Sequence, residues 1–327
     1  MESFEGKLAV VTGGGTGMGR ELVVQLATDG CSVATCDVNP TAMAETASRA
    51  EAAAPEGTRV TTHVCDVSDA AAVRRFRDEV VEQHATDHIN LLFNNAGIGG
   101  GGSFIAAPQE EWDRTFGVCW GGVYNCSRAF VPLLVASDDG YLVNTSSVNG
   151  FWAMTIPGMP HTAYSTAKFA VKGFSEALLE DFRVNAPHVK VAVVMPGHVG
   201  TDIVINSRRI HGGSDPEDMT ADEIAEARAQ MIARGVPEES LGDEQVKGLI
   251  KALAEGFRDS APLSAAGAAT IILDGVRAGA WRILVGEDAK ALDAAVRADP
   301  LSVYGEHGIN LMTVAGAARS ASEQSSS

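Results

Sequence analysis

The stretch Thr12-Gly13-Gly14-Gly15-Thr16-Gly17-Met18-Gly19-Arg20 joins an apolar run, residues 8–12, to a helix-length segment that begins at Glu21. Its glycines at positions 13, 17 and 19 have the spacing GxxxGxG, and the common GxGxxG spacing fits in no register. Glycines let the backbone approach a pyrophosphate, and the N-terminus of a helix offers unpaired N–H groups and a positive dipole. The alternative is a glycine-rich turn without a ligand, but the place between a strand and a helix predicts a nucleotide-binding loop.

Short apolar runs alternate with helix-length amphipathic segments along the chain. Val, Ile and Leu fill consecutive positions in most of these runs, as a strand buried on both faces requires. The predicted strands are 8–12, 32–36, 59–65, 89–93, 141–145, 190–195 and 281–285, and the helices between them include 41–54, 70–83, 110–131 and 163–185. This order predicts an α/β, Rossmann-type fold: a doubly wound parallel sheet of seven strands with helices on both faces.

The pattern changes in residues 202–262, where the sequence indicates no strand. One helix is predicted around Ile224 and Met231, and a second over residues 246–257, where apolar residues recur at helical spacing. The segment is too long for a plain loop and predicts a helical substrate lid, with a helical subunit contact as the alternative. We expect one domain, 1–327, with a C-terminal extension over 287–327, of which residues 320–327 are expected to be disordered.

The chain of 327 residues has 25 Lys and Arg against 42 Asp and Glu, a formal net charge of −17. Such an acidic chain lacks the basic surface that nucleic acids and anionic membranes attract, so neither is an expected partner. The N-terminus has no signal-peptide pattern, and no apolar run approaches the ~18 residues that span a bilayer. Five cysteines without a CxxC pair predict free thiols, no metal site and a cytoplasmic protein.

Asp37 ends the second predicted strand, 18 residues after Gly19. A carboxylate at this place can accept hydrogen bonds from the ribose hydroxyls of an adenosine, and it repels a 2′-phosphate. Thr16 and Val38 are neutral, and Arg20 falls on the helix, where it can point away. These residues favour NAD over NADP as the cofactor; the alternative for Asp37 is an ordinary carboxylate at a turn.

Tyr164 and Lys168 lie four residues apart, on one face of the predicted helix 163–185. Tyrosine is a poor base at neutral pH because its ordinary pKa is about 10, but an ammonium group one turn away favours the phenolate. Tyr164 could then take the proton from an alcohol while a hydride leaves. Ser147, directly after the fifth strand, could hydrogen-bond the substrate oxygen. Taken alone, a Tyr and a Lys four residues apart on a helix would be interpreted as ordinary surface residues. The position of this pair after Ser147 argues against that interpretation.

Five signals in this order resemble the short-chain dehydrogenase/reductase family over residues 5–201, with a looser match over 263–286. They are the glycine loop, Asp66 after the third strand, Asn94-Asn95-Ala96-Gly97 after the fourth, the set Ser147, Tyr164 and Lys168, and residues 196–201 after the sixth. The resemblance implies NAD(P)-dependent oxidation of an alcohol or reduction of a ketone. Tyr164 would be the general base or acid, Lys168 would hold the nicotinamide ribose, and Ser147 would steady the substrate oxygen.

The same resemblance implies the residues of the cofactor site. They are Gly13, Thr16, Gly17, Met18, Gly19, Asp37, Asp66, Val67, Asn95, Ala96, Gly97, Tyr164, Lys168, Pro196, Gly197, Val199 and Thr201. Asp66 would meet the adenine ring, and Thr201 would lie near the nicotinamide carboxamide. Many family members pair through the last helix and strand, here 264–278 and 281–285, so we expect a homodimer or a homotetramer.

Two features depart from the family pattern. Cys119 stands where the family usually has an asparagine that holds a water in a proton relay; its backbone carbonyl could still hold that water. Asn125, six residues on, is rotated off that face of the helix. The interval between Ser147 and Tyr164, 17 residues, is longer than usual. The candidate substrate contacts are Phe151, Trp152, Met154 and His198. Packing under the lid or in a subunit contact is the alternative.

These observations together predict an NAD-dependent oxidoreductase for an apolar secondary alcohol and its ketone. One alternative is an NADPH-dependent ketoreductase. Another is a non-catalytic NAD-binding regulatory protein, to which Cys119 gives some weight. The third is an epimerase or dehydratase, against which the glycine spacing counts.

Overall fold

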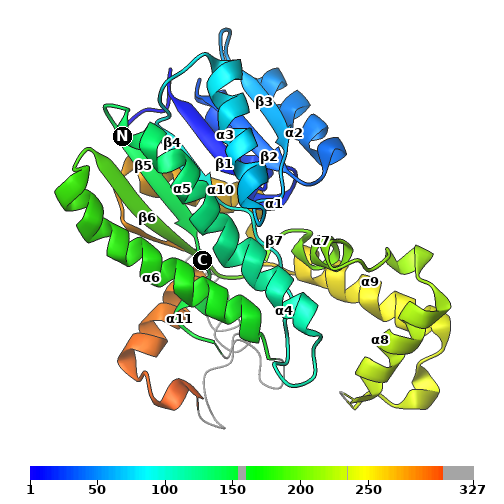
Figure 1. The fold of residues 1–327 in the computed structure, drawn as a ribbon. Helices are drawn as coiled ribbons and strands as arrows, with labels where there is room; N and C mark the ends of the chain where they lie inside the picture. The colour runs from blue at the N-terminus through cyan, green and yellow to red at the C-terminus, as the bar shows by residue number, and fades with distance from the viewer. Residues whose placement is uncertain (154–159, 234, 305–327) are drawn as a thin grey trace, which may run out of the picture.

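The computed structural model describes residues 1–153, 160–233 and 235–304. In this part of the chain seven parallel strands form one sheet in the order β3-β2-β1-β4-β5-β6-β9 (Figure 1). The strands are β1 (Leu8–Thr12), β2 (Ser32–Asp37), β3 (Val60–Val64), β4 (Leu91–Asn94), β5 (Gly140–Thr145), β6 (Val189–Pro196) and β9 (Arg282–Val285). Each overlaps one predicted run, so the seven-stranded parallel sheet is confirmed.

The strand order reverses beside β1. From β1 the chain adds β2 and β3 on one side, and then returns to place β4 on the other side of β1. Connections that leave β1 and β4 therefore turn in opposite directions, and a crevice opens between them at the carboxyl ends of the strands. This is the edge at which the predicted site residues gather.

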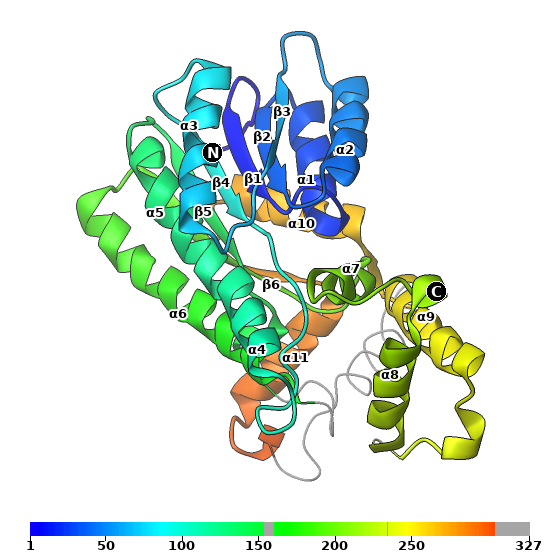
Figure 2. The ribbon, with the colours of Figure 1, turned by 45° about the vertical axis from the view of Figure 1, so that its right-hand side comes forward.

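Helices cover both faces of the sheet (Figure 2). One face carries α1 (Gly17–Thr28), α2 (Pro40–Ala53) and α10 (Ala265–Arg277); the other carries α3 (Ala70–His84), α5 (Gly122–Val135) and α6 (Thr162–Asn185). Neighbouring strand residues enter opposite cores: Val10 packs on the second face and Val11 on the first, and both are fully buried. Burial on both faces is the reason for the unbroken apolar runs in the sequence.

The predicted helix 110–131 is interrupted and longer than expected. α4 (Gln109–Phe116) passes into a π-helical turn, Gly117–Gly121, and continues as α5 to Val135. In the turn the N–H of Gly122 reaches back to the carbonyl of Gly117, and the glycines at its borders lower the cost of the wider backbone. The prediction that the helix stops before Pro132 was wrong, because this proline lies in the last turn and removes a single backbone hydrogen bond.

Three helices follow the short strand β7 (Val199–Gly200): α7 (Ile203–Ile210), α8 (Ala221–Ala233) and α9 (Asp243–Asp259). The sequence predicted α8 and α9 and missed α7. α8 and α9 share a small core of their own and project away from the sheet (Figure 1). The chain then returns through β8 (Leu263–Ser264), which pairs in parallel with β7, so the two ends of this insertion lie side by side.

α11 (Glu287–Ala298) follows β9 as the predicted C-terminal extension begins. Residues 154–159 and 305–327 lie outside the described residues, and with them Met154 and the stretch 320–327 for which disorder is predicted. Within the described ranges no helix combines the length and the hydropathy needed to cross a membrane.

Candidate functional site

The glycine loop lies where β1 and β4 separate, at the start of α1. A Cβ on Gly19 would stand 2.0 Å from the carbonyl oxygen of Gly13, and a Cβ on Gly13, whose φ is +70°, would stand 2.8 Å from Ala96 Cα. Asn95 closes the loop from β4: its backbone N–H donates to Thr12 Oγ1 and its Nδ2 donates to the Thr12 carbonyl, each at 3.0 Å. Only glycine fits at positions 13 and 19, so bare backbone faces outward at the N-terminus of α1.

A cavity of about 500 Å³ opens along this loop. Most of the residues predicted for the cofactor line it: Gly13, Thr16, Gly17, Met18, Gly19, Asp37, Asp66, Val67, Asn95, Ala96, Gly97 and Thr201. Pro196, Gly197 and Val199 do not line it. The volume falls in the range of ~300–1,000 Å³ that is usual for small-molecule and cofactor sites. The cradle of glycines at one side and the carboxylates at the other fit a dinucleotide.

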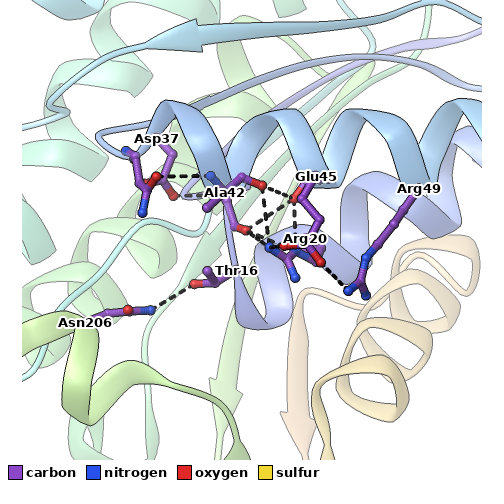
Figure 3. Close-up of polar contacts among 10 residues, drawn as sticks. Thr16, Arg20, Asp37, Ala42, Glu45, Arg49 and Asn206 are labelled. Carbon is purple, nitrogen blue, oxygen red and sulfur yellow. Dashed lines mark hydrogen bonds and ion pairs between the residues drawn. The ribbon is translucent and has the colours of Figure 1, made fainter.

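Asp37 is held at the end of β2 by backbone amides. Its Oδ2 accepts the N–H of Gly15 and its Oδ1 accepts the N–H of Asn39, both at 3.0 Å. Arg20 holds the same residue of the loop through its next peptide group: its Nε and Nη2 donate to the Gly15 carbonyl at 3.0 and 2.7 Å (Figure 3). The Arg20 guanidinium also pairs with Glu45 at 3.1 Å. It therefore points away from the cavity, and its charge is compensated.

Asp66 marks the far end of the cavity. Its Oδ1 accepts both the N–H and the hydroxyl of Ser68, and its Oδ2 forms an ion pair with Arg114 at 3.2 Å. Cys65 lines the cavity beside it. The hydrogen bond that Cys36 donates to Cys65, together with burial, raises the pKa of the Cys36 thiol well above its usual range and keeps that thiol protonated.

The structure brings Ser147, Tyr164 and Lys168 together where β5 meets α6. Lys168 is 2% exposed; its Nζ donates to the Thr145 carbonyl at 2.9 Å and lies 5.4 Å from the centre of the Tyr164 ring. Ser147, 7% exposed, accepts the N–H of Asn149 at 3.1 Å. The ammonium group is thus fixed between the end of β5 and the tyrosine, as the i,i+4 spacing predicted. These three residues lie outside the 500 Å³ cavity, beyond its Gly97 end.

Comparison with known proteins agrees with this geometry. The family profile described as short chain dehydrogenase matches residues 7–211. The chain belongs to the short-chain dehydrogenase/reductase family. SadH of Mycobacterium tuberculosis is 35% identical over 297 residues, which cover 91% of this chain and 92% of that protein.

One further relative matches part of this short-chain dehydrogenase, and one solved structure matches nearly all of it. Epidermal retinol dehydrogenase 2 of Homo sapiens is 33% identical over 202 residues, 61% of this chain and 62% of that protein. A crystal structure of a short chain dehydrogenase/reductase from Burkholderia phymatum in complex with NAD superposes with a TM-score of 0.71 at 27% identity, covering 92% of this chain and 96% of that one. The family and fold are therefore shown, and with them NAD(P)-dependent oxidoreductase chemistry.

Cys119, at the position where the family usually has asparagine, lies in the π-helical turn and is fully buried. Its Sγ donates to the Ile98 carbonyl at 3.2 Å and accepts the Ile98 N–H at 3.5 Å. Asn125 points elsewhere, as predicted: its Nδ2 donates to the Val67 carbonyl at 3.0 Å. It holds the connection after β3 and does not replace the family asparagine.

The structure does not place all of the predicted substrate contacts where a substrate could reach them. Trp152 is 0% exposed; it packs against Leu292 of α11, and its Nε1 donates to the Val303 carbonyl at 3.3 Å. Trp152 thus packs against α11, and neither under the lid nor in a subunit contact as the alternative had it; a side chain with no exposed surface cannot contact a substrate. Phe151 is partly exposed at the edge of the same cluster. The backbone N–H of His198 donates to Asp288 Oδ2 at 2.7 Å, and its ring Nε2 lies 2.7 Å from the Phe257 carbonyl oxygen.

α7 contributes residues to the cavity that the sequence analysis did not identify. Ile203, Asn206, Arg209 and Ile210 line it opposite the glycine loop. Asn206 Nδ2 donates to Thr16 Oγ1 at 3.1 Å, which ties α7 to the loop (Figure 3). No motif marks these residues; their spacing at i, i+3 and i+7 on one face is the signal that could have indicated them.

Proposed function

We propose that this protein is an NAD-dependent dehydrogenase that interconverts an apolar secondary alcohol and its ketone, with Tyr164 as the general base or acid. The observation that carries the proposal is the buried Lys168, whose ammonium group is fixed beside the Tyr164 ring next to Ser147.

The residues of the cavity support NAD as the cofactor. Asp37 lines it with both carboxylate oxygens oriented by backbone amides, so a 2′-phosphate would meet a fixed negative charge. Arg20 cannot compensate, because its guanidinium is bound to the Gly15 carbonyl and to Glu45. The family relatives include proteins solved with either NAD or NADP, so this preference rests on the residues of this chain.

When bound, the dinucleotide supplies the acceptor for a hydride. Tyr164 takes the proton of the substrate hydroxyl in oxidation and returns it to the carbonyl oxygen in reduction. Ser147 donates its hydroxyl to the same oxygen and stabilises the charge that develops there. The hydrogen bond from Lys168 to the Thr145 carbonyl holds its ammonium group beside the Tyr164 ring.

The substrate class is inferred from apolar residues and from a relative. The long interval after Ser147 carries aromatic residues, and Phe151 remains partly exposed there. One curated relative is named for retinol; because retinol is a primary alcohol, this name supports an apolar substrate and not the secondary class. We assign the insertion 202–262 as the lid over this substrate, since its first helix already lines the cofactor cavity.

The test is turnover of a panel of apolar secondary alcohols with NAD or NADP, followed as the absorbance of the reduced cofactor. We expect turnover with NAD, a higher kcat/KM for NAD than for NADP, and a loss of at least about 100-fold in kcat for Tyr164→Phe, since a positioned acid–base group contributes ~10²–10⁴-fold. The matched control is Tyr124→Phe, which changes a tyrosine on α5 whose side chain is 46% exposed. We expect this variant to keep full activity.

Undiminished turnover in Tyr164→Phe would refute the assigned base. Tight NAD binding without turnover of any alcohol would favour a regulatory protein, and a preference for NADP would overturn the assignment of Asp37.

A further inference from the structure

α7 approaches the glycine loop directly, at the place where a pyrophosphate would lie. Asn206 donates to Thr16, the residue that precedes the first turn of α1. Thr201 closes the same gap from below α7: a Cβ on Gly17 would stand 3.1 Å from Thr201 Cγ2. The cavity therefore has the N-terminus of α1 on one side and the Asn206 and Arg209 face of α7 on the other.

The cavity is poor in positive charge for a ligand with two phosphate groups. Asp37 and Asp66 line it, and the basic side chains that line it in the described part of the chain are Arg114 and Arg209. Arg114 is paired with Asp66 at the adenine end. The protein as a whole carries a net charge of −17, so the surrounding field also opposes an anion.

Arg209 lines the cavity and retains N–H donors that its bonds in the structure do not use. Its Nε and Nη2 donate to Asp215 at 2.7 and 2.9 Å, and its Nη1 donates to Asn206 Oδ1 at 3.2 Å. Asp215 raises the pKa of Arg209, so the guanidinium stays charged. A guanidinium has five N–H groups. The bonds in the structure use three, and one N–H on Nη1 and one on Nη2 are left for phosphate oxygens.

We propose that Asn206 and Arg209 complete the dinucleotide site: Asn206 fastens α7 onto the glycine loop, and Arg209 binds the pyrophosphate. This inference rests on the proposed NAD dependence and adds to it the residues that hold the middle of the cofactor. The glycine loop offers backbone N–H groups and a helix dipole but no charged side chain. Like Arg20 and Arg114, Arg209 is paired with a carboxylate, so it contributes N–H donors from the opposite wall rather than an unpaired charge. A planar guanidinium with two N–H groups to spare suits paired phosphate oxygens.

The experiment measures dissociation constants of NAD, ADP-ribose and adenosine by calorimetry or competition, without any turnover. Arg209→Gln should weaken NAD and ADP-ribose by about tenfold or more, the size of a lost charge-assisted hydrogen bond, and leave adenosine unchanged. Arg209→Lys should recover part of the loss. Asn206→Ala should weaken the binding of both NAD and ADP-ribose by about three- to tenfold, as one hydrogen bond is removed.

Arg208→Gln is the matched control on the same helix. Arg208 donates to the Ser214 carbonyl at 2.7 Å and does not line the cavity, so its loss should change NAD binding by less than about twofold. Equal losses in Arg208→Gln and Arg209→Gln would overturn the inference and leave the proposed function standing. Equal weakening of adenosine would also overturn it. A wild-type protein that binds neither NAD nor ADP-ribose would refute the proposed function itself.

Discussion

At the scale of single residues, Cys119 shows how a thiol occupies the place of an amide. Its Sγ both donates to the Ile98 carbonyl and accepts the Ile98 N–H, which an asparagine side chain would also do through its two amide atoms. The thiol is a weak partner in both bonds, and the π-helical turn around it is set by the glycines and by backbone bonds. The side chain at this position is therefore not required for the shape of the turn.

We expect Cys119→Asn to retain the wild-type kcat or to raise it. The amide can form both contacts with Ile98 more strongly, and the backbone carbonyl at this position is unchanged. Steady-state kinetics with the active alcohol measure the effect. Cys119→Ala, which loses both contacts, serves as the comparison. A collapse of turnover in Cys119→Asn would show that the thiol itself is needed.

At the scale of elements, α11 braces the turn that follows β6. Asp288, 2% exposed, accepts the backbone N–H of His198 on its Oδ2 at 2.7 Å. Gly197 makes room for this carboxylate, since a Cβ there would stand 2.3 Å from Asp288 Oδ2. α9 holds the same turn from its other side through the contact between the His198 ring and the Phe257 carbonyl. Two helices outside the central sheet thus fix the segment that leads to Thr201.

We expect Asp288→Ala to lower the free energy of unfolding by about 1–3 kcal/mol, because the buried His198 N–H loses its acceptor. We expect Asp288→Asn to lose less, since the amide oxygen can still accept that N–H. Urea unfolding measures both variants. Asp299→Ala, at the exposed end of the same helix, should lie within about 0.5 kcal/mol of the wild type. Equal stability of Asp288→Ala and the wild type would show that the turn does not need α11.

At the scale of the whole molecule, the protonation of His84 couples pH to unfolding. Burial first, and then the charges of Arg59 and His63, lower the pKa of His84 from 6.5 to about 4. The unfolded chain therefore binds a proton near pH 6.5 that the folded protein accepts only near pH 4. Between these values the unfolded state holds more protons, so the free energy of unfolding falls as the pH is lowered through this window.

We expect the wild type to lose about 1 kcal/mol more than His84→Gln between pH 6.5 and pH 4.5, a value reduced for the partial exposure of the ring. Above pH 7 the two proteins should show the same slope of stability with pH. Urea midpoints at half-unit steps of pH measure the difference. Gln83→Ala changes an exposed, non-ionisable neighbour on the same helix and should retain the wild-type slope. If the free energy of unfolding fell equally with pH in all three proteins, the loss of stability in acid would come from groups other than His84.

The features that were predictable from the sequence are those that repeat a physical pattern. Unbroken apolar runs predicted the sheet, and the glycine spacing and Asp37 predicted residues that line the cavity. The catalytic role of the Tyr164–Lys168 pair stays a prediction. α7 was missed because Ile203, Val204 and Ile205 form an apolar run without helical spacing, and an eight-residue helix offers little more to detect. Trp152 was placed wrongly because an aromatic residue in a loop does not indicate which neighbour covers it; here the cover is α11, far along the chain.

The pairing of β7 with β8 has a consequence for how such an enzyme can change over evolutionary time. Since Val199 lies beside Leu263 in a separate two-stranded sheet, the whole stretch between them leaves and returns at one point, and it could be exchanged for another without moving a strand of the central sheet. That exchangeable piece carries, on α7, part of the wall around the cofactor cavity, and in the proposed function it is also the lid over the substrate. A descendant that acquired a new substrate by replacing it would alter its hold on the cofactor in the same event.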